Sequence, residues 1–421
     1  MTFPQMRIAL PQLASNVATM AKWCSANGVE LWPHIKTTMC RPIVERQLAA
    51  GAAAVTVATA DQAAVAASWG CRRILVANQM VNPIALQRIW RLDAEVMILV
   101  DSERGVVLAE SAAREAGVIT DVLIDIGRRG GRTGVRDGRA ASTLAQRIRA
   151  SRALRLVGVS AYEAVGPEAT SREASALAVV DDHLRRAADV FVELVTMFET
   201  ERPVFTAGGS TFPDRVVAAA APVRAVPGAV VTLRSGCYIV HDHGLYQRVS
   251  PIAGLVPAVT VRAEVLSTPE SGVVVVGAGK RDVPHDADLP TVLGAFDARA
   301  TQRKRCRGTV AALYDHHAVV RLAEGNWPSG IWWTWGSRTP VGRLTAGRWW
   351  RSSTPTGGSS TSGRPTSSGP RAQSTEMRAQ SAEMRAQSAE MRAQSAVSAG
   401  CRPRGGSGAD PDRSASGSCC T

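Results

Sequence analysis

The sequence has no apolar run long enough to cross a membrane, and its first residues lack the basic-then-apolar pattern of a secretory signal. Its eight cysteines are scattered without the paired spacing of a metal knuckle, so we expect reduced thiols. The formal net charge is +13, yet no basic helix is interleaved with aromatic residues. These absences predict a cytoplasmic protein that binds neither membrane nor nucleic acid.

Strand-like and helical segments alternate over the first 250 residues. With 421 residues, 45% of them hydrophobic, the chain can form a large core and is expected to have two domains. An opening helix is predicted over Leu10–Ala26. One strand-like run ends near Lys36, and the others are Ala54–Val57, Arg73–Ala77, Glu95–Val100, Asp121–Ile126, Leu154–Ser160, Val204–Ala207 and Val230–Arg234. This alternation predicts an α/β fold, a (β/α)8 barrel of the TIM type over residues 1–250. A doubly wound open sheet is the alternative, but no glycine fingerprint follows the first strand.

Lys36 ends the short apolar run that begins at Glu30 and contains Pro33 and His34. A lysine at the carboxyl end of a buried strand is partly desolvated, which lowers its pKa and makes the neutral amine available. Such an amine can form a Schiff base with a carbonyl compound. The alternative is a structural lysine whose chain simply extends to solvent.

Further polar residues follow the later strands. A glycine-rich loop with three arginines covers 127–134, and Tyr162 follows the strand that ends at Ser160. Two glycines, a serine and a threonine occupy 208–211, where small residues let backbone amides approach an anion. The last barrel strand is followed by Tyr238. Because active sites of such barrels lie at the carboxyl ends of the strands, we expect these residues to meet Lys36 there.

Six segments together resemble one enzyme family. They read PHIKT, DIGRRGGRTGV, VGVSAYEA, TAGGSTF, RSGCYIVHDHGLY and, at 277–290, GAGKRDVPHDADLP. The chain resembles the fold-type III pyridoxal-phosphate (PLP) enzymes, whose barrel is like the N-terminal domain of alanine racemase. It is most similar to the D-threonine aldolase and D-serine dehydratase branch, the amino acid deaminase/aldolase proteins. The resemblance extends over roughly residues 8 to 323.

The resemblance implies a role for each candidate site residue. Lys36 would bind PLP covalently and act in catalysis together with Tyr162. Arg132 and Tyr162 would lie beside the cofactor ring or the substrate, and His34 precedes the lysine in the family pattern too. The cofactor phosphate would be held by Gly208, Gly209, Ser210 and Thr211, with Tyr238 nearby. A histidine that commonly follows two residues after the lysine is Thr38 here.

The resemblance also implies a reaction. The chain is expected to be a PLP-dependent lyase that acts on a β-hydroxy D-amino acid, either by dehydrating D-serine or by retro-aldol cleavage of the D-threonine type. A homodimer is implied as well. The alternatives are a PLP-binding protein without catalysis and a metal-independent racemase, which would need a second base opposite the lysine.

The alternation stops near residue 251. Strand-like runs at Val259–Val265, Gly272–Gly277 and Ala318–Leu322 predict a smaller β domain over 251–324, which we expect to be incomplete. The family usually has an extended segment before the first helix, and only Met1 to Met6 occupy that place here.

Composition changes near Gly325. Residues 325–421 are rich in Ser, Gly, Pro and Thr and contain a seven-residue repeat from Arg371, so a disordered tail is predicted. Six of the ten tryptophans fall between Trp327 and Trp350. Tryptophan has a single codon, so the bases beside each tryptophan are known and part of the peptide encoded in a shifted reading frame can be inferred. In that frame Trp332–Gly336 would encode Val-Asp-(Leu/Met/Val)-Gly followed by an apolar residue. Permitted codons then give a His-x-Cys sequence. We interpret the tail as out-of-frame translation from near Gly325.

This interpretation bears on metal binding. The dehydratase-like family carries a zinc-binding His-x-Cys pair in this region, and neither ligand is present in the chain as written. The sequences His241–His243 and Asp315–His317 are interpreted as loop residues, so no metal ligands are assigned. The lyase activity of this chain is therefore expected to be impaired.

Overall fold

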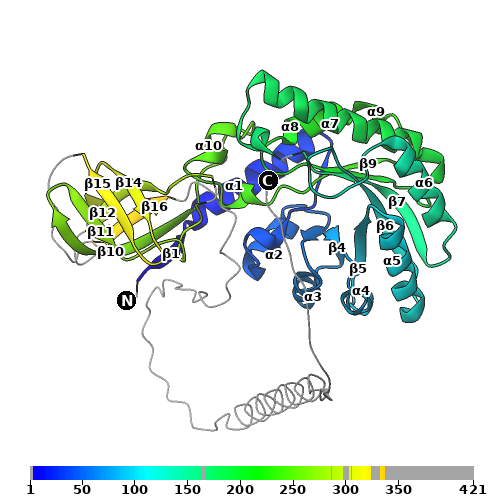
Figure 1. Cartoon of the computed structure of the whole chain (residues 1–421), viewed down its shortest axis with the longest axis horizontal. Coiled ribbons are helices and arrows are strands. Elements are labelled where there is room, and N and C mark those ends of the chain that lie inside the picture. Colours follow the sequence, from blue (N-terminus) through cyan, green and yellow to red (C-terminus); the bar gives the residue numbers. More distant parts are fainter. Residues whose placement is uncertain are drawn as a thin grey trace, which may run out of the picture. The chain divides into compact units, whose positions relative to one another are not determined.

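The computed structural model of the chain describes residues 3–163, 166–285, 287–296, 303–304, 306–323 and 332–336. Its strands form two sheets, one parallel and one antiparallel (Figure 1). None of the described helices is long and apolar enough to cross a membrane.

The parallel sheet is a closed barrel, which confirms the predicted fold. Its strands are β2 (Glu30–Leu31), β3 (Val55–Val57), β4 (Arg73–Gln79), β5 (Glu95–Val100), β6 (Thr120–Ile126), β7 (Leu154–Ala161), β8 (Val204–Ala207) and β9 (Val230–Leu233). They are hydrogen-bonded in the order β2-β9-β8-β7-β6-β5-β4-β3. An isolated parallel bridge between His34 and Thr56 joins the two ends of this order. The sheet therefore closes at the segment that leads to Lys36.

Helices surround the barrel strands (Figure 1). They are α1 (Leu10–Ala26), α2 (Arg41–Ala49), α3 (Ala60–Ser68), α4 (Pro83–Trp90), α5 (Glu103–Ala116), α6 (Gly138–Arg149), α7 (Ala174–Glu193), α8 (Pro213–Ala219), α9 (Ala221–Arg224) and α10 (Leu245–Val249). Local sequence sets their ends. For example, the Ser102 hydroxyl accepts a hydrogen bond from Gly105 N at the start of α5, and Gly117 ends that helix with φ 69°.

An apolar cluster separate from the helix-covered core lies inside the barrel. It contains Trp32, Ala54, Leu75, Met97, Leu99, Leu123, Val157 and Val204. Side chains alternate between the two faces of a strand, so residues two positions further along also point inward. Those residues are Asp125 after Leu123 and Ala77 after Leu75, and both line a cavity. The cluster is therefore the floor of a polar site at the carboxyl ends of the strands.

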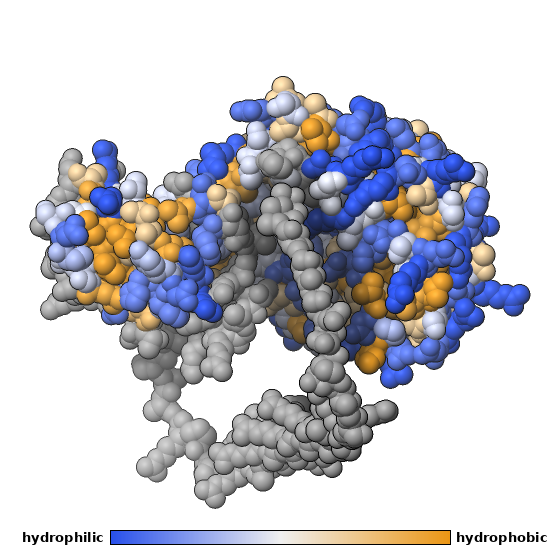
Figure 2. All heavy atoms as spheres, viewed as in Figure 1, coloured by the Kyte–Doolittle hydropathy of each residue, from blue (hydrophilic) through white to orange (hydrophobic). Residues whose placement is uncertain are grey.

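The antiparallel sheet belongs to the second domain. Its strands are β1 (Gln5–Ile8), β10 (Val259–Glu270), β11 (Val273–Val276), β12 (Thr291–Phe296), β13 (Arg303–Lys304), β14 (Gly308–Leu313), β15 (Ala318–Leu322) and β16 (Trp332–Gly336). The short segment before the first helix does form a strand, because Gln5–Ile8 pairs with residues 259–262 of β10. On the face shown in Figure 2, hydrophobic residues gather over this sheet among hydrophilic ones.

Strand β16 differs from the sequence-based expectation. Trp332–Gly336 lies inside the segment predicted to be disordered, yet its backbone pairs antiparallel with both β10 and β12. The prediction of disorder is wrong for these five residues. The rest of the tail lies outside the described residues, and the domain boundaries at 250 and 324 stay predictions.

Candidate active site

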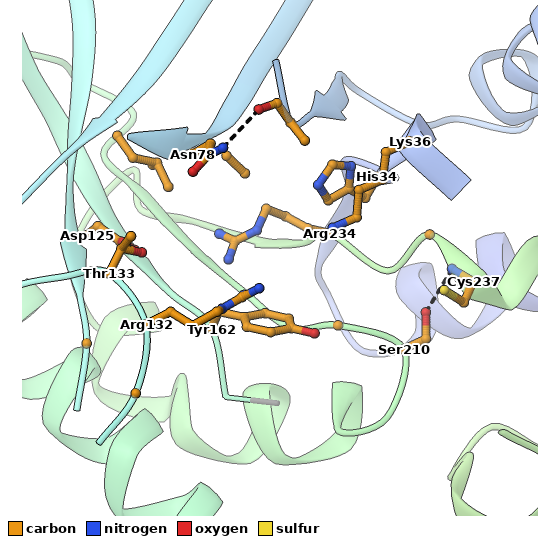
Figure 3. Close-up of a pocket in the computed structure, with 18 of the residues that line it drawn as sticks. His34, Lys36, Asn78, Asp125, Arg132, Thr133, Tyr162, Ser210, Arg234 and Cys237 are labelled. Carbon is orange, nitrogen blue, oxygen red and sulfur yellow. Dashed lines mark hydrogen bonds between the residues drawn. The ribbon is translucent and has the colours of Figure 1, made fainter. Parts of the chain in front are cut away.

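A cavity of about 270 Å³ opens at the carboxyl ends of the barrel strands. It is lined by seven of the residues selected from the sequence: His34, Lys36, Arg132, Tyr162, Gly208, Gly209 and Ser210. Figure 3 labels five of them, which come from segments that are far apart in the chain: His34, Lys36, Arg132, Tyr162 and Ser210. The expected meeting of the loops after several strands therefore occurs.

Lys36 lies just beyond the point where the barrel closes. Extended backbone continues from β2 to His34, whose amide donates to Arg234 O at 3.2 Å. A 3₁₀ turn at Ile35–Thr37 then carries Lys36. Because this segment is hydrogen-bonded to β9 and bridged to β3, the lysine is held at the rim of the barrel interior.

Burial changes the proton affinity of both basic groups in this segment. Desolvation lowers the pKa of Lys36, and the Arg132 and Arg234 guanidinium groups add to that shift, while Cys237 opposes it. The pKa of His34 lies well below its usual range, chiefly through burial and then through the charge of Lys36. His34 is thus a neutral imidazole at neutral pH. The neutral form of the Lys36 amine is more populated at a given pH than the neutral form of an exposed lysine.

Arg234 is a buried guanidinium that points into the middle of the cavity (Figure 3). Its Nη1 donates to Thr206 O at 3.0 Å and to Ser160 Oγ at 3.1 Å, and its Nη2 donates to Ala161 O at 2.6 Å. Ser160 Oγ in turn donates to Asp125 Oδ1 at 3.2 Å. This network fixes a positive charge at the floor of the site and links it to a carboxylate.

The Asp125 carboxylate is itself well supplied with donors. Thr133 Oγ1 donates to Asp125 Oδ2 at 2.8 Å, and Gln79 Nε2 donates to the same oxygen at 3.2 Å. Burial raises the pKa of Asp125, and the bond from Thr133 and the charge of Arg234 oppose that rise. The arginine and the carboxylate therefore stabilise each other's charged forms in a dry site.

Tyr162 and Arg132 form a stacked pair on one side of the cavity. The guanidinium carbon of Arg132 lies 4.7 Å from the centre of the Tyr162 ring. Burial raises the pKa of Tyr162 to about 12, and the neighbouring Glu163 carboxylate contributes to that rise. The phenol consequently keeps its proton near neutral pH and can donate a hydrogen bond.

Backbone amides of the glycine segment are partly used within the protein. The amides of Gly208 and Gly209 donate to the Glu163 carboxylate at 3.1 and 2.8 Å. Ser210 Oγ accepts from Cys237 N at 3.0 Å, so its own hydroxyl proton can be donated into the cavity (Figure 3). Within the described part of the chain, the Gly236 amide also donates no hydrogen bond.

Two of the predicted cofactor contacts do not line the cavity. Thr211 is buried outside the cavity lining, and Tyr238 is only 2% exposed. The Tyr238 hydroxyl accepts a hydrogen bond from Gln47 Nε2 at 2.9 Å, and its ring packs in the core between barrel and helices. The 3₁₀ turn at Cys237–Ile239 directs this side chain away from the cavity.

Several cavity residues were quoted in the sequence motifs without being assigned a role. These are Asp125, Arg234, Cys237 and Tyr246. Alternation along the strands could have found Asp125, because Leu123 is a floor residue two positions earlier. Arg234 directly follows the last barrel strand, which is the same signal that selected Tyr162.

The two histidine-containing segments, His241–His243 and Asp315–His317, are interpreted from the sequence as loop residues. Among the described residues, no group of three His, Cys, Asp or Glu side chains could hold a metal ion. Asp242 Oδ1 accepts hydrogen bonds from the amides of Gly244 and Tyr246 at 2.8 and 2.9 Å, so this carboxylate shapes the turn before α10.

Two family models match the chain: "Alanine racemase, N-terminal domain" over residues 8–210 and "Putative serine dehydratase domain" over residues 258–344. Together with the parallel barrel and the lysine at its carboxyl face, these matches define a class. The chain belongs to the fold-type III PLP-dependent enzymes. The second match continues past Gly325, so it gives no support to a change of frame at that residue.

Within this class the chain is similar to D-amino acid lyases. A D-threonine aldolase of Arthrobacter sp. is 26% identical over 326 residues, which are 76% of this chain and 80% of the aldolase. A D-threo-3-hydroxyaspartate dehydratase of Delftia sp. strain HT23 is 35% identical over 135 residues, which are 31% of this chain and 35% of the dehydratase. The crystal structure of the D-threonine aldolase from Filomicrobium marinum shares the fold, with a TM-score of 0.67, 23% identity and coverage of 80% of this chain and 87% of that one.

The cavity fits PLP in its size and in its donors. Small-molecule sites span roughly 300–1,000 Å³, and the volume of this cavity lies just below that range. Lys36 supplies the amine, Arg234 supplies a fixed cation for the ring, and the Ser210 hydroxyl and Gly236 amide supply donors for an anion. Of the predicted phosphate residues that line the cavity, Ser210 is thus the one whose donor is not already engaged.

A substitution at Gly236 would test whether the position of the Lys36 segment controls PLP binding. A Cβ atom at this position would lie 2.3 Å from His34 O and 2.9 Å from Thr37 Oγ1. Gly236→Ala should therefore displace the segment that carries Lys36 and weaken PLP binding by about tenfold or more, as measured by titrating the visible absorption of the bound cofactor. Gly138→Ala is the control, because its Cβ would come closest to the flexible end of Glu193, at 3.0 Å, and would otherwise make only ordinary contacts. Unchanged affinity in Gly236→Ala would show that this contact does not position the lysine.

Proposed function

We propose that the chain is a PLP-dependent lyase acting on a D-amino acid that carries a hydroxyl group on Cβ. The observation that supports this most strongly is Lys36, an amine with a lowered pKa in a cationic cavity of a fold-type III barrel. Two of the similar enzymes are named for D-threonine and D-threo-3-hydroxyaspartate, and both compounds have a β-hydroxyl.

When bound, PLP withdraws electrons from the Cα of an amino acid joined to it. The protein's own groups supply the remaining chemistry. In dehydration Lys36 Nζ, as the neutral amine, would accept the proton from Cα, and the resulting ammonium would protonate the departing hydroxyl so that it leaves as water. In retro-aldol cleavage the neutral amine would accept the proton of the β-hydroxyl and, as the ammonium, would return it to Cα. Arg234 keeps a fixed positive charge at the floor, and the walls of the cavity limit access of water.

Tyr162 and Arg132 lie where they can orient the substrate. The protonated phenol can donate to a hydroxyl or carboxylate oxygen, and the stacked guanidinium gives that wall a positive charge. A racemase would instead need a second base opposite Lys36. Burial raises the pKa of both tyrosines that line the cavity, Tyr162 and Tyr246, so each keeps its proton and neither is a base near neutral pH.

The metal requirement and the assembly remain part of the proposal. In the family a zinc ion polarises the β-hydroxyl, and no histidine follows His317 in this chain. We therefore propose that lyase activity is weak in the chain as written. The alternative function is PLP binding without efficient turnover. The homodimer and the cytoplasmic location stay predictions.

A paired assay tests the proposed function. D-Serine and D-threonine are incubated with the PLP-loaded chain, with and without added Zn²⁺, and pyruvate, ammonia, glycine and acetaldehyde are measured. We expect products from at least one D-substrate and none from the L-enantiomers. Formation of L-alanine from D-alanine at a higher rate would instead identify a racemase, and PLP binding without any product would identify a binding protein.

A further inference from the structure

Glu163 holds two adjacent amides of the glycine segment in a bidentate arrangement. Its Oε2 accepts from Gly208 N at 3.1 Å, and its Oε1 accepts from Gly209 N at 2.8 Å. The residue is 1% exposed and immediately follows Tyr162. A buried carboxylate therefore ties the loop after β7 to the loop after β8.

The same pair of hydrogen bonds also fixes the position of the Tyr162 ring. A Cβ atom on Gly209 would lie 3.1 Å from Cε2 of Tyr162, so this ring packs directly on the glycine backbone. Gly208 has φ +90°, a conformation that L side chains rarely adopt. The glycine turn, the Tyr162 ring and the Glu163 carboxylate thus form one rigid unit.

The direction of the Ser210 side chain depends on that rigid unit. Because the carboxylate fixes the amides of Gly208 and Gly209, the turn delivers Ser210 to the cavity, with its hydroxyl accepting from Cys237 N. A phosphate could take the Gly208 and Gly209 amides only if the buried Glu163 charge left them. Moving this buried carboxyl group away from both of its donors would leave its oxygens unpaired inside the protein, which is costly, so the carboxyl group and the phosphate use different donors.

We propose that Glu163 is a positioning residue for the phosphate of the cofactor, acting through the Gly208–Gly209 backbone to aim the Ser210 hydroxyl. This inference rests on the proposed function only in that PLP is the ligand. Glu163 does not line the cavity and need not touch the cofactor. Its carboxylate orients the group that does.

Binding of PLP and of pyridoxal, which lacks the phosphate, tests the inference without turnover. Glu163→Gln has only one acceptor oxygen and cannot satisfy both amides. We expect its affinity for PLP to fall by about tenfold to a hundredfold, the range of a charge-assisted hydrogen bond, while affinity for pyridoxal changes far less. Inorganic phosphate should compete with PLP in the wild type at lower concentration than in the variant.

Glu110→Gln is the matched control. Glu110 is another buried carboxylate, paired with Arg147 at 2.6 Å and Arg114 at 3.3 Å on the outer helices. Its loss should lower thermal stability without changing the ratio of PLP to pyridoxal affinity. Glu163→Asp keeps the charge with a shorter reach, and we expect its PLP affinity to fall between those of the wild type and Glu163→Gln.

Three outcomes would overturn the inference. An equal loss of PLP and pyridoxal affinity would mean that Glu163 only supports the fold. Tighter PLP binding in Glu163→Gln would mean that the carboxylate competes with the phosphate for the same amides. Unchanged affinity for both ligands would mean that the tie does not position Ser210. A wild-type chain that binds neither ligand would contradict the proposed function instead, so the two failures are distinguishable.

Discussion

Lys36→Ala is expected to lose covalent PLP binding and its visible absorption, and to lower any D-amino acid turnover by at least about 10²–10⁴-fold. That range is the usual contribution of one proton-transferring group. The physical reason is that Lys36 Nζ is both the point of attachment and the base. Lysine occurs only at positions 22, 36, 280 and 304, so borohydride reduction followed by peptide mapping identifies the attachment site unambiguously.

The controls for this prediction follow from the same cavity. Lys36→Arg keeps a positive charge but has no neutral amine near neutral pH, so it should behave like the alanine variant. Lys22→Ala and Lys280→Ala change exposed lysines and should retain PLP. Cofactor attached to any lysine other than Lys36 would contradict the assignment.

The pH dependence has a definite sign. Burial is the main cause of the lowered pKa of Lys36, so the neutral amine becomes populated at a lower pH than for an exposed lysine. The rate of PLP capture should rise with pH and level off at a lower pH than capture by a lysine peptide.

The second large effect concerns the sequence after Gly325. If the nucleotide sequence is restored to the alternative frame, a His-x-Cys pair, bound zinc and metal-dependent lyase activity are expected to return together. Metal polarisation of the leaving hydroxyl contributes several kcal/mol, so activity should rise by about a hundredfold or more. Zinc content by atomic absorption and the D-serine assay measure this, and sequencing across codons 320–345 is the first step.

The chain as written provides the opposing test. Full-length protein with stoichiometric zinc and efficient turnover of D-serine would contradict the frame interpretation. His316 and His317 would then be the first pair to replace, because they are the last two histidines of the sequence. The backbone pairing of β16 already shows that part of this segment has regular structure.

The barrel could be predicted from sequence because its signals are local. Glu95–Val100 and Val204–Ala207 are strands with the predicted bounds, and α1 covers the predicted Leu10–Ala26. Buried parallel strands are nearly continuous apolar runs, and capped helices separate them. Strand β12 was missed because Gly294 interrupts its pattern, where the structure has a register shift. Strand β14, GTVAAL, was missed because its small residues favour a strand only weakly.

Those parts of the site that depend on residue type and on position after a barrel strand could be predicted from the sequence. Lys36, Arg132, Tyr162 and Ser210 meet because each follows a strand of one barrel. The use of the Gly208 and Gly209 amides by Glu163 could not be predicted, since it depends on how two loops pack across a distance of 45 residues or more in the chain. Tyr238 was misplaced for a similar reason, because a single 3₁₀ turn decides which way it points.

The closure of the barrel at Lys36 also sets an order on synthesis at the ribosome. Backbone hydrogen bonds join Trp32 and His34, just before Lys36, to Leu233 and Arg234, and the β1 segment pairs with residues 259–262. Nearly two hundred residues must therefore leave the ribosome after Lys36 before its surroundings are complete. A nascent chain is thus unable to assemble the site until β9 has emerged, and cofactor uptake belongs to the final stage of folding.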